Sequence, residues 1–140
     1  MSPAGVFLDT SGIYEAADRA GHRHAEAAAA FRDLLASRNR LITTDLVLAE
    51  VHGLTLGRVG PEQALELVDR LTSAARLELV SIDGSVRDQA VELLQARPGR
   101  RISLTDAVSF VVMRERGLEV AFALDSDFGA EGFRMLPAAG

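Results

Sequence analysis

The chain has 140 residues, 48% of them hydrophobic, and a net charge of −5, which predicts one globular domain over residues 1–140 without a membrane-spanning segment. It has no cysteine, which excludes thiolate metal sites, cysteine nucleophiles and disulfide scaffolds and makes the cytoplasm the expected location. All 15 cationic side chains are arginine, so chemistry that needs lysine is excluded, and the negative net charge disfavours a simple basic surface for nucleic acids.

Apolar runs alternate with helical patterns along the whole chain. In chain order we expect a strand at 5–8, a helix at 25–36, a strand at 40–43, helices at 44–56 and 62–75, a strand at 77–82, helices at 85–96 and 104–116, and strands at 120–124 and 133–136. This alternation predicts an α/β fold with a mostly parallel sheet and helices on both faces.

Turn residues bound the two helices that follow each other in tandem. Gly57 is expected to close the first helix, and Gly60 with Pro61 separates it from the second. Helical spacing in the second helix predicts an apolar stripe made of Leu65, Val68, Leu71 and Thr72. We therefore expect a helical hairpin.

Two predicted strands run directly into aspartate. Leu8 is followed by Asp9, and Leu124 is followed by Asp125, with Asp127 two residues further on. Because ligands of open α/β sheets bind outside the carboxyl ends of the strands, these acids are expected at one functional edge. The structural alternatives are a helix N-cap for Asp9 and a turn for Asp125 and Asp127.

Glu50 is a carboxylate on an otherwise apolar helix face, which it shares with Leu46, Val47 and Leu54. An ionised carboxylate that faces the core needs a cation, a metal or a group of hydrogen-bond donors, or its pKa rises. A metal site is one interpretation. An ion pair with arginine, or a protonated buried acid, is the structural alternative.

Asp106 occupies a similar position at the start of its helix, on the same face as Phe110 and Met113. The run Ser103-Leu104-Thr105-Asp106 also fits the capping-box pattern, in which the acid only caps its own helix. Asp106 alone therefore does not indicate a functional site.

The argument for a site comes from the four positions together, since Asp9, Glu50, Asp106 and Asp125 can all converge on one pocket in this fold. Close carboxylates repel, and a divalent metal is the usual compensation. Oxygen ligands without cysteine or an obligatory histidine select Mg²⁺ or Mn²⁺ over Zn²⁺. Magnesium held in this way acts on phosphate substrates, which favours phosphodiester hydrolysis.

The formal charge agrees with such a site. Setting aside these four acids and Asp127 takes the net charge from −5 to 0. Three arginines, Arg97, Arg100 and Arg101, lie in a loop shortly before Asp106, where they could meet phosphates beside the metal. A solvated turn is the structural alternative for this loop.

Four short motifs, in this order and spacing, closely resemble the PIN-domain ribonucleases, and in particular the VapC-like toxins of bacterial type II toxin–antitoxin pairs. The motifs are Phe7-Leu8-Asp9-Thr10-Ser11, Thr44-Asp45-Leu46-Val47-Leu48-Ala49-Glu50-Val51, Ser103-Leu104-Thr105-Asp106-Ala107 and Ala123-Leu124-Asp125-Ser126-Asp127-Phe128. Together they span nearly the whole chain.

The resemblance implies roles for individual residues. Asp9, Glu50, Asp106 and Asp125 would be the catalytic, metal-binding acids, and Asp127 would be an auxiliary metal ligand ranked after Asp125. The residues expected to bind the substrate are Thr10, Ser11, Thr105, Arg100 and Arg101.

The resemblance also implies a fold, an activity and partners. The sheet would be five-stranded and parallel in the order 3-2-1-4-5. The activity would be Mg²⁺- or Mn²⁺-dependent endoribonuclease action on tRNA, rRNA or mRNA, inhibiting translation or growth. A homodimer is expected, with a cognate VapB-like antitoxin that reaches into the acidic pocket; DNA would be bound only through that antitoxin.

Three other interpretations fit part of the same pattern. A catalytically idle module would hold the metal or a partner's arginines without cleaving RNA. A PIN nuclease of RNA processing would act without an antitoxin. Receiver domains and haloacid-dehalogenase-type phosphatases also gather acids around Mg²⁺, but both depend on a lysine that this chain lacks.

Overall fold

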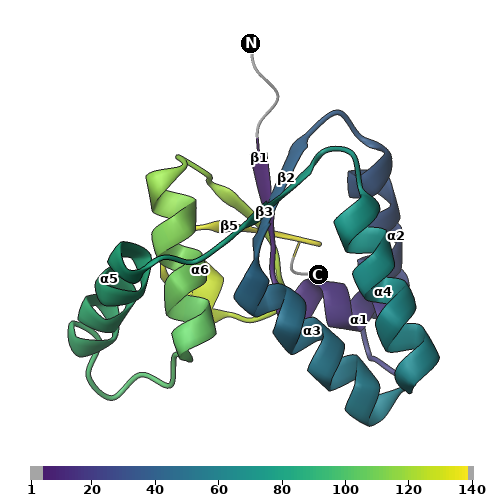
Figure 1. The fold of residues 1–140 in the computed structure, drawn as a ribbon, viewed down its shortest axis with the longest axis horizontal. Coiled ribbons are helices and arrows are strands. Elements are labelled where there is room, and N and C mark those ends of the chain that lie inside the picture. Colours follow the sequence, from purple (N-terminus) through teal and green to yellow (C-terminus); the bar gives the residue numbers. More distant parts are fainter. Residues whose placement is uncertain (1–4, 139–140) are drawn as a thin grey trace.

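The computed structural model describes residues 5–138, which form five strands and seven helices (Figure 1). In chain order these are β1 (Gly5–Leu8), α1 (Thr10–Ala17), α2 (His24–Ala36), β2 (Arg40–Thr44), α3 (Asp45–Arg58), α4 (Pro61–Ser73), β3 (Leu77–Val80), α5 (Gly84–Gln95), α6 (Leu104–Glu115), β4 (Val120–Phe122), α7 (Asp127–Ala130) and β5 (Arg134–Leu136).

The strands form one sheet in the order β3-β2-β1-β4-β5, and every pairing is parallel. In Figure 1 the sheet lies between α5 and α6 on one side and α2, α3 and α4 on the other. The predicted α/β fold and the strand order implied by the resemblance are confirmed. Since all strands run the same way, their carboxyl ends lie along a single edge of the sheet.

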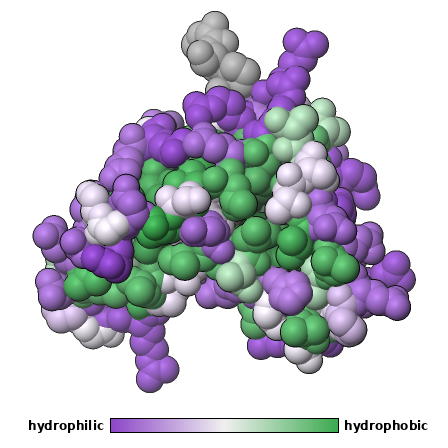
Figure 2. All heavy atoms as spheres, in the orientation of Figure 1, coloured by the Kyte–Doolittle hydropathy of each residue, from purple (hydrophilic) through white to green (hydrophobic). Residues whose placement is uncertain are grey.

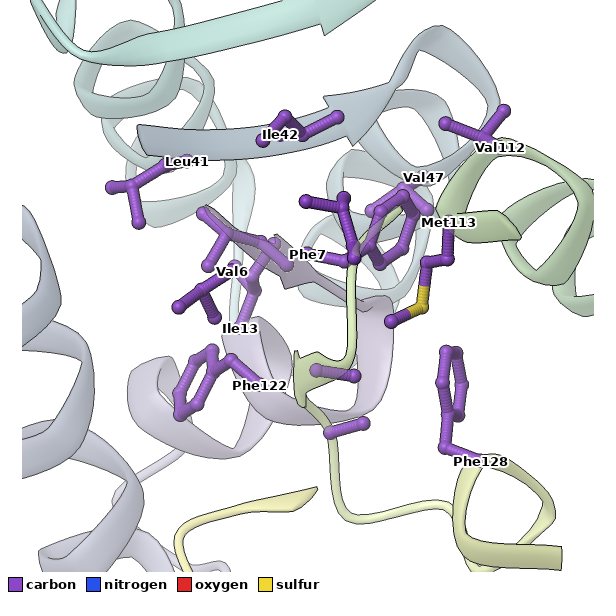
Figure 3. Close-up of a cluster of buried hydrophobic side chains, with 14 of the residues drawn as sticks. Val6, Phe7, Ile13, Leu41, Ile42, Val47, Val112, Met113, Phe122 and Phe128 are labelled. Carbon is purple, nitrogen blue, oxygen red and sulfur yellow. The ribbon is translucent and has the colours of Figure 1, made fainter. Parts of the chain in front are cut away.

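The core is buried on both faces of the central strands. Phe7 of β1 stacks on Phe128 with ring centroids 6.5 Å apart, on the side of α6 and α7. Phe122 of β4 stacks on Phe31 of α2 at 5.7 Å. Figure 3 shows these directions, with Phe7, Met113 and Phe128 gathered on one side of the strands and Phe122 with Ile13 on the other. Helices on both faces explain why β1 and β4 are continuous apolar runs.

The tandem helices differ from prediction in their ends and in their buried face. Gly57 does not close α3, which continues to Arg58; the chain turns at Gly60, whose φ is +147° and whose amide donates to the Thr55 carbonyl. The buried stripe of α4 consists of Ala64, Leu67 and Leu71. Leu71 is buried as predicted and Val68 is half-buried, but Leu65 is 58% exposed and Thr72 is exposed, so the predicted register of this helix was wrong by part of a turn.

Two strands end earlier than predicted, and side chains accept hydrogen bonds from backbone amides shortly after each end. The amide of Ile82 donates to the Asp45 carboxylate, and β3 ends at Val80. The amides of Leu124 and Asp125 donate to a single hydroxyl, and β4 ends at Phe122. The short helix α7 after this point was not predicted, because its residues were interpreted as a turn.

Helix α1 packs unusually close to β4. A Cβ built on Gly12 would lie 2.6 Å from the backbone oxygen of Phe122. Only glycine fits here, and its close approach brings the start of α1 against the end of β4.

The viewed face of the molecule has two lobes. Figure 2 shows hydrophobic residues across its middle and an indentation at its lower margin, between the α5–α6 lobe and the α3–α4 lobe. β1 runs from the N-terminus toward this margin in Figure 1. None of the helices within residues 5–138 is both long and apolar enough to cross a membrane.

Candidate active site

Asp9 stands between β1 and α1 and is 2% exposed. Its Oδ2 accepts from the amide of Ser11 at 3.1 Å and from the Ser11 hydroxyl at 2.6 Å, so Asp9 caps α1 as the structural alternative predicts. Its second oxygen, Oδ1, is buried without a hydrogen-bond partner among the described residues. A buried carboxylate oxygen without a donor is destabilising, and it is available to a ligand.

Ser11 joins two distant segments at the strand ends. Its hydroxyl donates to Asp9 and accepts from the amides of Leu124 and Asp125, at 2.9 and 3.1 Å. The hydroxyl therefore fixes the carboxyl end of β4 against the start of α1. The sequence predicts a substrate-binding role for Ser11, and the structure places its side chain in a contact between the two predicted acidic positions.

Asp106, Asp125 and Asp127 lie close together although they come from different segments. Each offers one carboxylate oxygen, and the three oxygens lie within 4.8 Å of one another. Asp125 Oδ1 also accepts from the Asp127 amide at 2.9 Å, which is the local turn predicted as the alternative. Ser103 caps α6 by accepting from the Asp106 amide at 3.0 Å. The Asp125 carboxylate thus combines its turn with membership of the cluster, whereas the Asp106 carboxylate makes no hydrogen bond back to the Ser103 amide within residues 5–138.

Glu50 lies on the second turn of α3, outside the group formed by Asp106, Asp125 and Asp127. It is half-buried rather than in the core, because the buried face of α3 is formed by Val47, Val51 and Thr55. It makes no ion pair within residues 5–138, so the predicted alternative of an arginine partner is not found there. Its charge lies close enough to Asp106 to raise the pKa of that carboxyl.

The acids perturb one another. Burial, with a smaller contribution from the charge of Asp125, raises the pKa of Asp9 from 3.8 to about 6, against the opposing effect of the Ser11 hydrogen bonds. Burial raises the pKa of Asp106 to about 7, and the charges of Asp9, Asp125 and Glu50 add to this. Without a cation, the pocket therefore holds protons near neutral pH.

The other predicted substrate-binding residues have different surroundings. Thr10 is buried, and its hydroxyl has no partner among the described residues. Thr105 is half-buried beside Asp106. Arg101 is exposed and forms no ion pair within residues 5–138, whereas Arg100 pairs with Asp127 at 3.0 Å. Of the three arginines predicted to meet phosphates, Arg97 and Arg100 bind acids, and only Arg101 is unengaged by an acid in the described part of the chain.

Sequence reasoning missed Glu131, whose side chain is 2% exposed and is bound by three arginines. Arg97, Arg100 and Arg114 all donate to its carboxylate, at 2.7–3.0 Å. The hydrogen bonds from Arg97, followed by those from the other two, lower the pKa of Glu131 to about 2. The sequence feature that could have identified Glu131 is its position four residues after Asp127, which places both acids on one side of a short helix.

Comparison with known proteins identifies the family. The PIN-domain family model matches residues 6–132. The chain belongs to the PIN-domain family. It is also 37% identical over 131 residues to the 23S rRNA-specific endonuclease VapC20 of Mycobacterium tuberculosis, covering 91% of this chain and 95% of that protein. The predicted resemblance to VapC-like PIN-domain ribonucleases is confirmed.

Solved structures agree with this assignment. The crystal structure of Mycobacterium tuberculosis VapC20, a sarcin–ricin loop cleaving toxin, superposes with a TM-score of 0.82 and 29% identity over 91% of this PIN-domain chain and 95% of that one. VapBC2 from Rickettsia felis, bound to a promoter DNA fragment, gives a TM-score of 0.67 at 18% identity over 94% and 96% of the two chains. The second likeness shows the fold alone.

The residues of this PIN domain fit a divalent cation. The buried Asp9 Oδ1 lacks a donor, and the three clustered aspartate oxygens repel one another unless protonated or neutralised. All of the candidate ligands are carboxylates, the donor set preferred by Mg²⁺ and Mn²⁺. The site is therefore chemically suited to the metal expected from the sequence.

The raised pKa values predict how the stability of the metal-free protein depends on pH. The folded pKa values of Asp9 and Asp106, about 6 and 7, lie above the ordinary 3.8, so between pH 4 and 7 the folded state binds more protons than the unfolded state. The free energy of unfolding should therefore fall as pH rises through this window, and divalent metal should counteract the fall.

This expectation is measured by thermal unfolding in EDTA and in excess Mn²⁺ at pH 5, 6.5 and 8. We expect a higher Tm at pH 5 than at pH 8 in EDTA, and the largest stabilisation by Mn²⁺ at pH 8. The double variant Asp9→Asn/Asp106→Asn is the control and should lose most of both effects. If the double variant shows the same pH dependence as the unchanged chain, groups other than Asp9 and Asp106 cause that dependence.

Proposed function

We propose that this chain is a metal-dependent endoribonuclease and the toxin of a VapBC-type pair. The observation that carries the proposal is the cluster of Asp106, Asp125 and Asp127, whose carboxylate oxygens lie within 4.8 Å of one another, together with the unpartnered buried oxygen of Asp9. The similarity to VapC20 over most of both chains supports the same activity.

Within this proposal, Asp9, Asp106 and Asp125 hold Mg²⁺ or Mn²⁺, with Glu50 and Asp127 as further acidic ligands. When bound, such an ion lowers the pKa of a coordinated water and neutralises charge on the scissile phosphate. Ser11 keeps the carboxylates of Asp9 and Asp125 in register through its three hydrogen bonds. Hydrophobic packing around α6, where Ala107 to Met113 are all buried, keeps Asp106 fixed.

The substrate is proposed to be RNA, with ribosomal RNA as the first candidate because the 37% identical relative is a 23S rRNA-specific endonuclease. Exposed Arg101, close in sequence to Asp106, is suited to a phosphate of the bound strand. Thr10 and Thr105 are proposed to contact the substrate beside the acids. An antitoxin of the VapB type is the proposed protein partner, and a homodimer the proposed assembly.

The test is cleavage of total RNA and of intact bacterial ribosomes by the purified chain, with Mg²⁺, Mn²⁺ or EDTA, followed by mapping of the new RNA ends. We expect discrete cuts that require metal and that Asp106→Asn reduces at least about 100-fold, since the variant removes a metal ligand. Glu78→Gln, in an exposed ion-pair group on β3, is the matched control and should cleave normally. Binding of RNA without metal-dependent cleavage would favour the idle module instead.

A further inference from the structure

The loop between α5 and α6 presents two arginines to one buried acid. Arg97 and Arg100 bound a turn in which Pro98 and Gly99 are the central residues, Gly99 has φ +83°, and the Arg100 amide donates to the Arg97 carbonyl. A Pro-Gly pair favours this turn, since glycine is suited to the positive φ. The turn brings both guanidinium groups onto the carboxylate of Glu131.

The two arginines differ in one contact. Arg97 donates through Nε and a terminal nitrogen to Glu131, at 3.0 and 2.9 Å. Arg100 donates to Glu131 at 2.7 Å and, with its other terminal nitrogen, to Oδ1 of Asp127 at 3.0 Å. Their side chains are similarly exposed, 34% and 32%. Arg100 is thus the arginine of this pair that links Glu131 to the acidic cluster.

Glu131 cannot neutralise the cations that surround it. One carboxylate receives three guanidinium groups, with Arg114 as the third, so the group carries an excess of positive charge. Arg100 carries part of this excess to Asp127. Because the Glu131 side chain is buried and bound by three arginines, it holds Arg100 beside Asp127 in the metal-free protein.

Asp127 therefore belongs to the acidic cluster and to an ion pair with Arg100 at the same time. One of its oxygens lies within 4.8 Å of oxygens of Asp106 and Asp125, and its carboxylate is also paired with a guanidinium. A divalent cation at the cluster and the guanidinium of Arg100 attract the same carboxylate and repel each other. By linkage, each must weaken the binding of the other to Asp127.

We propose that Arg100, anchored by Glu131, competes with the divalent cation for Asp127 and so sets a lower metal affinity than the number of acids alone would give. This inference rests on the proposed metal-dependent function. Asp127 contributes fully to metal binding only when Arg100 leaves it, and Arg100 is a positioning residue that does not touch the reacting atoms.

The test is the dissociation constant of Mn²⁺, measured without RNA by electron paramagnetic resonance and by calorimetry. Arg100→Met is expected to bind Mn²⁺ about threefold more tightly than the unchanged chain, the range of a partly exposed ion pair. Arg97→Met removes an equal charge from Glu131 but no contact with Asp127, and should change the constant less than half as much. Arg100→Lys, which keeps the charge without the planar fork, should lie between.

A double-mutant cycle separates competition from a structural role of the loop. In an Asp127→Asn background, Arg100→Met should no longer change Mn²⁺ affinity. Equal effects of Arg97→Met and Arg100→Met, weaker Mn²⁺ binding by Arg100→Met, or an unchanged effect in the Asp127→Asn background would each overturn the inference. Circular dichroism verifies that every variant is folded at the temperature used.

The same experiment distinguishes this inference from the proposed function. If the unchanged chain binds Mn²⁺ and Asp106→Asn does not, the metal site stands, and the arginine variants decide the competition alone. If the unchanged chain binds no Mn²⁺, both the metal site and the competition are wrong.

Discussion

Replacement of Asp9 by asparagine is expected to abolish RNA cleavage while making the metal-free protein more stable at pH 8. Asparagine keeps the size of the side chain and remains a good N-cap, so the contact with the Ser11 amide can persist. It removes a carboxylate that is 2% exposed and has one oxygen without a donor. The negative charge of Asp9 destabilises the metal-free protein, and the same charge is needed to bind the metal.

Cleavage by Asp9→Asn should fall at least about 100-fold at saturating metal, because a lost ligand weakens transition-state stabilisation by several kcal/mol. The free energy of unfolding in EDTA at pH 8 should rise by about 1–2 kcal/mol, since a carboxyl whose pKa is raised to about 6 is ionised there. At pH 5 the gain should be about half as large, because the folded carboxyl is then protonated while the unfolded one, with its ordinary pKa of 3.8, is still mostly ionised; below about pH 4 the gain should vanish.

Asp83→Asn is the matched control for this substitution. Asp83 caps α5 by accepting from the Val86 amide at 3.0 Å, and its side chain is exposed. It should keep full cleavage and change stability by less than about 0.5 kcal/mol at either pH. Lower stability of Asp9→Asn at both pH values would show that its effect is loss of the cap and not relief of a buried charge.

Most of the acidic positions could be predicted because they follow a local rule. Asp9 and Asp125 end apolar strands and Asp106 opens a buried helix, whereas the apolar face assigned to Glu50 is not the buried face of α3. Parallel strands then bring their carboxyl ends to one edge, whatever the details of packing. These rules apply within a few residues of each acid, so they can be read without coordinates.

Contacts between distant segments could not be predicted in the same way. The Ser11 hydroxyl meets the amide of Leu124, 113 positions later in the chain. The pairing of Arg100 with Asp127 and Glu131 depends on how the 96–103 loop folds back onto α7. Arg100, which is close in sequence to Asp106, was predicted to meet phosphates. In the structure its partners are the carboxylates of Asp127 and Glu131.

The buried face of α4 was predicted incorrectly, because the spacing of its apolar residues is compatible with two different faces. In α4, Leu65 and Leu67 both have apolar neighbours at helical spacing, and the sequence prediction chose the first. The structure buries Leu67 with Ala64 and Leu71, because contact with α3 and the sheet decides which face turns inward. Local periodicity sets the helix, while the neighbouring elements set its rotation.

Replacement of Gly12 by alanine is expected to destabilise the protein by about 2–4 kcal/mol, although alanine is the better helix former by about 1 kcal/mol. The added Cβ would lie 2.6 Å from the Phe122 oxygen and 2.9 Å from its carbonyl carbon. Both atoms belong to the backbone of β4, so the contact can be relieved only by moving α1 away from the strand. That movement separates Ser11 from the amides of Leu124 and Asp125.

Gly53→Ala in the middle of α3 is the matched control, since nothing lies within 4 Å of the added Cβ. It should stabilise the protein by about 0.5–1 kcal/mol through helix propensity alone. Urea unfolding of both variants measures the difference, and Mn²⁺ affinity below the transition measures the site. We expect Gly12→Ala to weaken Mn²⁺ binding as well, because Asp9 and Asp125 are held in register by the contact it disrupts. A Gly12→Ala protein as stable as the Gly53→Ala protein would contradict the close approach of α1 to β4.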